Sequence, residues 1–204
     1  MEEQKIIEQI NQGSIINPIS AILSLTKVGR LFTIIALLIA LSIATLYVTI
    51  NNLNIFNAIS MYMTMIFMAW LSIIDYKTYT LPNSILLAWL ILRTLMLFFS
   101  FAFFGDFETL TFSLIGAFSM GILFLIMYYV SKRSLGGGDV KLSFVLSLSL
   151  TTYYSFTAVF LALIICSLYS VIGIWLKKLT RKSHLPLGPF LFAGTLLAYL
   201  IAIL

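Results

Sequence analysis

The sequence predicts an all-α integral membrane protein, a polytopic helical bundle of about six to seven transmembrane helices. Of its 204 residues, 61% are hydrophobic and only 9% are charged, whereas a soluble domain carries roughly a quarter charged residues. Apolar runs near or above about 18 residues recur along the chain. The loops between these runs alternate between loops with and loops without Lys or Arg, which is typical of a chain that crosses a bilayer repeatedly.

Six apolar runs are candidates for membrane-spanning helices, each of which needs about 20 residues. They are residues 31–50, 55–74, 84–104, 109–130, 154–176 and 187–204. A further run, residues 140–150, is too short to cross a bilayer unaided. A short helix starting at Asp139, a turn near residues 151–154 and a longer returning helix fit this segment best. Such a short helix is tolerated where it faces protein or water instead of lipid.

The first 30 residues are predicted to form a separate segment. They contain Glu2, Glu3 and Glu8 and lack the basic start and apolar core of a cleavable signal peptide. Isoleucines between residues 6 and 22 favour an amphipathic stretch on the membrane surface, and a partly disordered tail fits them equally well. We therefore divide the chain into a cytoplasmic or interfacial segment, residues 1–30, and a transmembrane domain, residues 31–204.

Basic residues predict the side of each loop, because Lys and Arg mark the cytoplasmic side. They precede the first run and recur in every second loop: Lys27 and Arg30; Lys77; Lys132, Arg133 and Lys141; and Lys177, Lys178, Arg181 and Lys182. We expect these loops and the N-terminus to face the cytoplasm. This placement accounts for the net charge of +5, so no nucleic-acid partner is expected. Arg93, inside a run, is expected to reach the inner surface or to pair with an acid.

Two acids at the inner ends of apolar segments are the candidate functional residues. Asp75 ends the second run, and Asp139 begins the short helix after three glycines. An ionisable group at such a depth costs several kcal/mol unless it is paired or hydrated. Asp106 and Glu108 lie in an outer loop, where water would solvate them, so we interpret them as surface acids.

Each candidate acid also has a purely structural interpretation. Asp139 could be the N-cap of the short helix, and Asp75 could mark the point where a helix leaves the bilayer, with Lys77 as a surface partner. Pro82 and Asn83 would then start the next helix. The pair favours chemistry instead, because two carboxyls at an apolar boundary share one proton. One ionised and one protonated carboxyl are what aspartic proteolysis uses; which residue plays which role stays open at this level.

Three separated motifs resemble those of type IV prepilin peptidases, which are membrane aspartic proteases of the GxGD class. Asp75 with Leu81-Pro82-Asn83 resembles the first catalytic motif, and Gly136-Gly-Gly-Asp-Val-Lys141 resembles the second. Pro186-Leu-Gly-Pro-Phe190 is similar to the motif that opens the last helix of the family. The resemblance covers a core from about residue 55 to residue 204.

The resemblance implies an endopeptidase that removes the basic leader of prepilins or pseudopilins at the cytoplasmic face of the cell membrane. Asp75 and Asp139 would be the catalytic pair, with no metal or other cofactor. The active-site loops would include Gly136, Gly137, Gly138, Lys141, Pro82 and Asn83, with the glycines leaving room for an extended substrate. We interpret Pro186, Gly188 and Pro189 as helix-entry residues without a chemical role, and His184 as a surface group.

One feature departs from many bacterial members of the family, which carry two zinc-binding cysteine pairs in an insertion and also N-methylate the mature pilin. Cys166 is the single cysteine of this chain, which excludes a cysteine-pair metal site. The loop at residues 51–54 is short. We therefore expect a peptidase without methyltransferase activity. The oligomeric state is not predicted.

Three alternatives remain at this level. A presenilin-like or signal-peptide-peptidase-like protease would show Tyr-Asp at the first site and Pro-Ala-Leu near the end, where this chain has Ile74-Asp75 and Pro186-Leu-Gly-Pro189. A proton-coupled transporter would use the two acids as a relay, but the chain shows no inverted repeat. A non-catalytic assembly factor leaves both acids unexplained.

Overall fold

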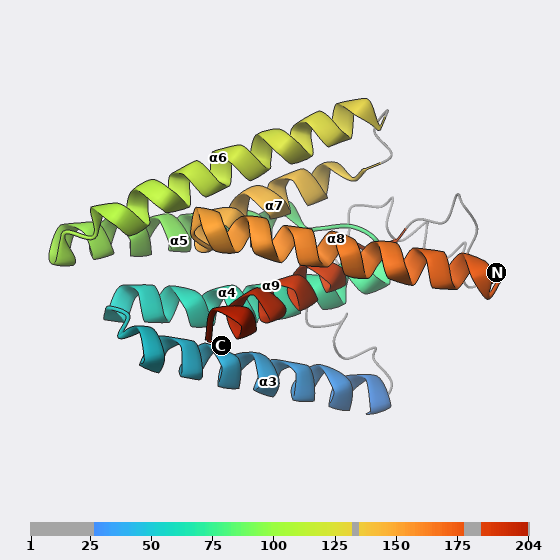
Figure 1. The fold of residues 1–204 in the computed structure, drawn as a ribbon, viewed down its shortest axis with the longest axis horizontal. Coiled ribbons are helices and arrows are strands. Elements are labelled where there is room, and N and C mark those ends of the chain that lie inside the picture. The colour runs from blue at the N-terminus through green and yellow to red at the C-terminus, as the bar shows by residue number, and fades with distance from the viewer. Residues whose placement is uncertain (1–26, 132–134, 178–184, 204) are drawn as a thin grey trace.

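A computed structural model describes residues 27–131, 135–177 and 185–203, with the side chains of residues 27–32 excepted. The predicted surface segment at the N-terminus and His184 lie outside these residues. The described chain is an all-α bundle, as predicted (Figure 1). Its helices are α3 (Lys27–Asn51), α4 (Ile55–Thr78), α5 (Asn83–Phe104), α6 (Phe107–Val130), α7 (Gly137–Ser149), α8 (Thr152–Trp175) and α9 (Gly188–Ile203).

Five of the described helices, α3 to α6 and α8, are long and apolar enough to cross a membrane. The helix α9 is apolar but has only 16 residues, fewer than the predicted run. The helix α7 has 13 residues, and those from Val145 to Ser149 are all buried. It lies between α6 and α5 and touches α4 and α8. The short helix therefore faces protein, as predicted, because its backbone and serine hydroxyls are shielded from lipid by the longer helices.

Helix ends explain how the predicted and observed bounds differ. The helix α4 runs four residues past the predicted end, to Thr78, and stops where Tyr79 adopts a left-handed conformation with φ 51°. Asp75 therefore lies inside the last turn. Pro82 occupies the N-cap position of α5, which begins at Asn83 as predicted. The N-cap position of α7 is Gly136, so the interpretation of Asp139 as an N-cap is wrong: this acid belongs to the first turn of the helix.

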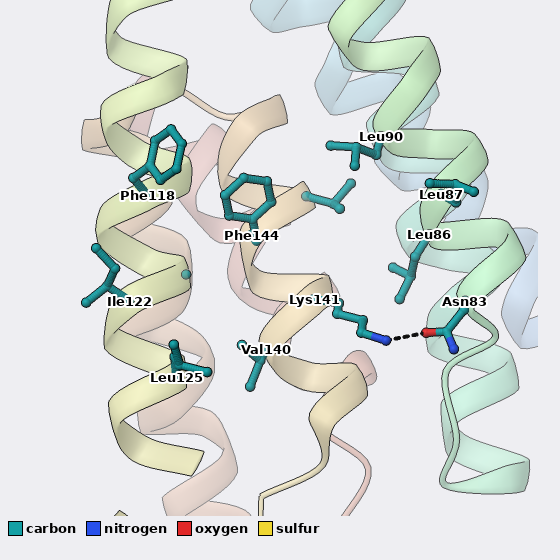
Figure 2. Close-up of a pocket in the computed structure, with 12 residues that line it drawn as sticks. Asn83, Leu86, Leu87, Leu90, Phe118, Ile122, Leu125, Val140, Lys141 and Phe144 are labelled. Carbon is teal, nitrogen blue, oxygen red and sulfur yellow. Dashed lines mark hydrogen bonds between the residues drawn. The ribbon is translucent and has the colours of Figure 1, made fainter. Parts of the chain in front are cut away.

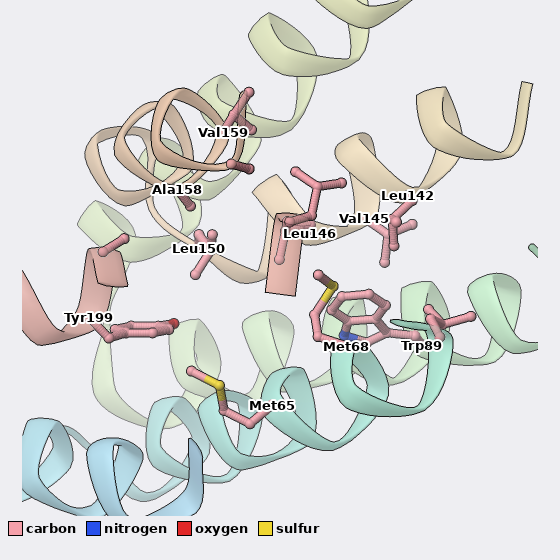
Figure 3. Packing of buried hydrophobic residues seen from close by; sticks show 14 of the residues in the cluster. Met65, Met68, Trp89, Leu142, Val145, Leu146, Leu150, Ala158, Val159 and Tyr199 are labelled. Carbon is pink, nitrogen blue, oxygen red and sulfur yellow. The ribbon is translucent and has the colours of Figure 1, made fainter. Parts of the chain in front are cut away.

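The main core cluster takes buried side chains from each of the described helices, α3 to α9. Met65 and Met68 of α4, Trp89 of α5 and Leu146 of α7 belong to this cluster, in which Met68 lies next to Trp89 (Figure 3). Gly194 brings α9 close to α8, because a Cβ at this position would contact the Ala158 carbonyl oxygen and would lie 2.8 Å from the Ala162 nitrogen. Small residues at such a contact allow two helices to pack backbone to backbone. The C-terminal helix is thereby fixed inside the bundle.

The buried cation Arg93 links four helices. Its guanidinium donates hydrogen bonds to Ser60 Oγ on α4 at 2.7 Å, to Ser113 Oγ on α6 at 3.3 Å and to the Leu148 carbonyl on α7 at 3.0 Å. The side chain is 3% exposed. The expectation that Arg93 reaches the inner surface is therefore wrong, because neutral oxygens inside the bundle replace water around this charge.

Candidate active site

Asp75 is held in place by the beginning of α9. It is 4% exposed, and its Oδ2 accepts a hydrogen bond of 2.7 Å from the backbone N–H of Gly188. A Cβ at residue 188 would lie 3.0 Å from this oxygen and 3.1 Å from the Asp75 Cβ. Such contacts are tighter than is usual for a Cβ, so glycine allows the backbone of α9 to approach the carboxyl this closely.

Asp139 occupies the first turn of α7, a helix outside the five that are long enough to cross the membrane. Burial, together with the negative charge of Asp75, raises the pKa of the Asp139 carboxyl to about 6, while a hydrogen bond from the Gly136 backbone N–H acts in the opposite direction. The repulsion operates between two carboxyls that lie 64 positions apart in the sequence. The fold thus brings the two predicted acids into electrostatic contact.

Of the three glycines before Asp139, Gly136 and Gly138 are in close contact with neighbouring residues, and none of the three has a positive φ. Among the described glycines, the one with positive φ is Gly105. A Cβ on Gly138 would lie 3.1 Å from the Leu81 Cβ, so this glycine lets the loops of the first two motifs touch. A Cβ on Gly136 would lie 3.0 Å from Asp139 Oδ2, whereas one on Gly137 would meet nothing within 4 Å.

Lys141 and Asn83 connect the start of α7 to the start of α5. The Lys141 Nζ donates a hydrogen bond of 2.8 Å to Asn83 Oδ1 (Figure 2). Both residues lie at one end of a groove of about 540 Å³ between α5, α6 and α7. The other residues that line the groove are a glycine and residues with apolar side chains: Leu86, Leu87, Leu90, Phe118, Gly121, Ile122, Leu125, Val140, Phe144 and Val145.

Sequence reasoning missed the contribution of Gly188. Its interpretation as a helix-entry residue without a chemical role did not foresee the hydrogen bond to Asp75. The donor is a backbone N–H, which leaves no mark in the residue type. The signal that could have found it is the stretch Pro186-Leu-Gly-Pro189 at a helix start, where the first N–H groups have no acceptor within the helix.

The interpretation of Asp106 as a water-solvated surface acid is wrong. Its Oδ2 accepts hydrogen bonds from Asn57 at 2.6 Å, Asn54 at 3.0 Å and Ser100 at 3.1 Å, and its Oδ1 accepts one from the Thr109 N–H at 3.1 Å. Asp106 is the N-cap of α6.

Within the described ranges, no group of three or more His, Cys, Asp or Glu side chains could hold a metal ion.

Comparison of the sequence with models of known protein families gives a match. The model of the type IV leader peptidase family matches residues 62–171, which is more than half of the chain. The chain belongs to the type IV leader peptidase family. The predicted family is thereby confirmed, and the matched part of this leader peptidase family member includes Asp75 and Asp139 but not the third motif, residues 186–190.

A curated relative supports the same family. The chain is 34% identical over 88 residues to a prepilin leader peptidase/N-methyltransferase of Bacillus subtilis (strain 168). The alignment covers 43% of this leader peptidase family member and 35% of the relative, so the matched part spans about a third of that protein's length. No solved structure matches the chain.

Proposed function

We propose that the protein is a membrane-embedded aspartic endopeptidase that removes the leader of prepilins or pseudopilins at the cytoplasmic boundary of the cell membrane. The observation that carries the proposal is the electrostatic contact between Asp75 and Asp139, two acids at the inner ends of different helices inside the family match. Family membership and the curated relative support the substrate class.

The proposed chemistry needs one ionised and one protonated carboxyl. The ionised carboxylate takes a proton from a water molecule, whose oxygen attacks the scissile carbonyl carbon. The protonated carboxyl donates a hydrogen bond, and then its proton, to the carbonyl oxygen. Burial of the pair keeps competing water away and strengthens both interactions. No step of this scheme requires a metal ion.

The groove between α5, α6 and α7 is where we place the apolar segment that follows the leader. Val140 and Lys141 line the groove and directly follow Asp139 in the chain. A substrate helix seated there would lie against apolar side chains, and its beginning would reach the polar end formed by Lys141 and Asn83. The peptide bond before that helix would then lie next to the acid pair.

Substitution of either acid tests the proposal. We expect Asp75→Asn and Asp139→Asn each to lower the rate of leader removal by about 10² to 10⁴-fold, because each removes a proton-transfer group. The measurement is the mass loss of a coexpressed prepilin-like substrate, with thermal unfolding in detergent to show that both variants fold. Asp106→Asn, which changes an acid outside the pair, is the control. Normal cleavage by the Asp139→Asn variant would refute the mechanism.

A further inference from the structure

The two acids differ in what surrounds them, and this difference bears on how they divide the proposed reaction. Asp75 receives a direct N–H hydrogen bond from another helix, at 2.7 Å from Gly188. Gly188 is the first residue of α9, so its N–H has no acceptor within that helix and carries the partial positive charge of the helix start. Both features favour a carboxylate over a neutral carboxyl at Asp75.

Burial acts against an ionised Asp75, since this side chain is almost inaccessible to water. The Gly188 N–H offsets part of this cost, because a hydrogen bond to an ionised acceptor is shorter and about twice as strong as one between neutral groups. At Asp139, burial and the charge of Asp75 outweigh the hydrogen bond from Gly136, and the pKa rises to about 6. The other titratable groups near the inner ends of these helices are Tyr76 and Lys77 on α4 and Lys141 on α7.

We propose, on the basis of the function proposed above, that Gly188 is a positioning residue that keeps Asp75 ionised, so that Asp75 acts as the base and Asp139 carries the shared proton. With Oδ2 held by α9, Oδ1 is the oxygen of Asp75 that remains to accept a proton from water. The third motif of the chain thereby gains a role in the proposed reaction.

This division of roles gives a balanced reaction. Water transfers a proton to Asp75 as its oxygen bonds to the carbonyl carbon, and Asp139 gives its proton to the carbonyl oxygen. When the carbon–nitrogen bond breaks, the leaving nitrogen takes the proton from Asp75. One hydroxyl of the intermediate returns a proton to Asp139, forming the new carboxyl group and restoring the pair. One water molecule is consumed, and no other reactant is needed.

The order of ionisation can be measured directly, because the chain contains three aspartates, Asp75, Asp106 and Asp139. Side-chain carboxyl ¹³C labelling of aspartate in the full-length protein therefore gives three carbon signals. Each is assigned by its loss in an Asp→Asn variant. As the pH rises, we expect the Asp75 signal to reach its ionised position before the Asp139 signal. The reverse order, or simultaneous titration, would overturn the proposal.

A variant tests the contribution of Gly188. Gly188→Ala places a methyl group against Asp75, and we expect kcat for leader removal to fall about a hundredfold, with KM within about threefold. Pro189→Ala, which keeps Gly188 and its N–H, is the matched control and should retain most of the activity. Full activity of Gly188→Ala would overturn the positioning role.

The two proposals fail separately. If Asp75→Asn and Asp139→Asn both cleave normally, the proposed function is wrong, whatever the order of ionisation. If both variants abolish cleavage but Asp139 ionises before Asp75, the proposed function is supported and the assignment of base and acid is wrong. The titration of the wild-type protein decides this even if Gly188→Ala fails to fold.

Discussion

At the scale of single residues, the acids at the two ends of the bundle are stabilised in different ways. Asp106 accepts four hydrogen bonds from neutral groups, and these lower its pKa although burial alone would raise it. At Asp139, in contrast, burial and the negative charge of the Asp75 carboxyl raise the pKa. A satisfied acid of the first kind ties segments together, whereas an acid of the second kind is poised to exchange a proton.

The cluster around Asp106 leads to a prediction about stability. Asp106→Asn retains an N-cap side chain but cannot accept from every donor, and leaving one of these partly buried donors unpaired costs up to about 1–3 kcal/mol. We expect a lower midpoint of thermal unfolding at neutral pH and a rate of leader removal within about twofold of the wild type. Because the pKa of Asp106 is below its ordinary value of 3.8 in the folded state, its carboxylate stabilises the fold above about pH 4.

The pH dependence provides the check. As the pH falls through the folded-state pKa of Asp106, the carboxylate of the wild type is protonated and its contribution disappears. Thermal unfolding of both proteins in the same detergent, followed from neutral pH to below pH 4, should show the difference between them shrink. A difference that is constant over this range would show that the carboxylate charge contributes nothing.

At the scale of helices, the short α7 shapes the groove in which we propose that the substrate lies. Because α7 is too short to span the bilayer, the space beside its first turns is bordered by α5 and α6, and an apolar groove results. Gly121 on α6 allows this arrangement, since a Cβ there would lie 2.8 Å from the Phe144 ring on α7. The helix that carries Asp139 is therefore also the floor of the groove.

Filling the groove tests its role. Ile122 lines it and is 55% exposed, so Ile122→Trp should occupy the space without disturbing the core. We expect kcat/KM for leader removal to fall about tenfold, mainly through KM, because the indole competes with the apolar segment of the substrate. The control is Ile115→Trp, on the same helix, 50% exposed and outside the groove lining. Equal activity of the two variants would contradict a substrate groove.

At the scale of the whole molecule, the apolar runs predicted most helix positions to within a few residues. They did so because hydrophobic length decides which segments can lie in a bilayer. They underestimated α4, whose last turn contains Tyr76 and Lys77 and interrupts the apolar pattern without ending the helix. The partners of Arg93 and Gly188 were not predicted, because they are a carbonyl, hydroxyls and a carboxyl on segments distant in sequence.

The motifs predicted the acids of the candidate site but not its geometry. Asp75 and Asp139 stand out because charges are rare in this chain and each follows or precedes an apolar run. That α9 reaches Asp75 follows from its packing against α8 and α4, which depends on shape complementarity between helices and is not encoded in any local pattern.

The orientation of the bundle supplies the final prediction. The α4–α5 loop lies at the end of the bundle that carries Asp75. The first turn of α8 follows the turn after α7 and lies toward the opposite end (Figure 1). In a Cys166→Ser background, cysteines at Thr80 and at Tyr153, both exposed positions, should react from opposite sides of the membrane. We expect a membrane-impermeant maleimide to label Tyr153→Cys in intact cells and Thr80→Cys only after permeabilisation. Labelling of Thr80→Cys in intact cells would place the acid pair on the outer face, where a cytoplasmic leader could not reach it.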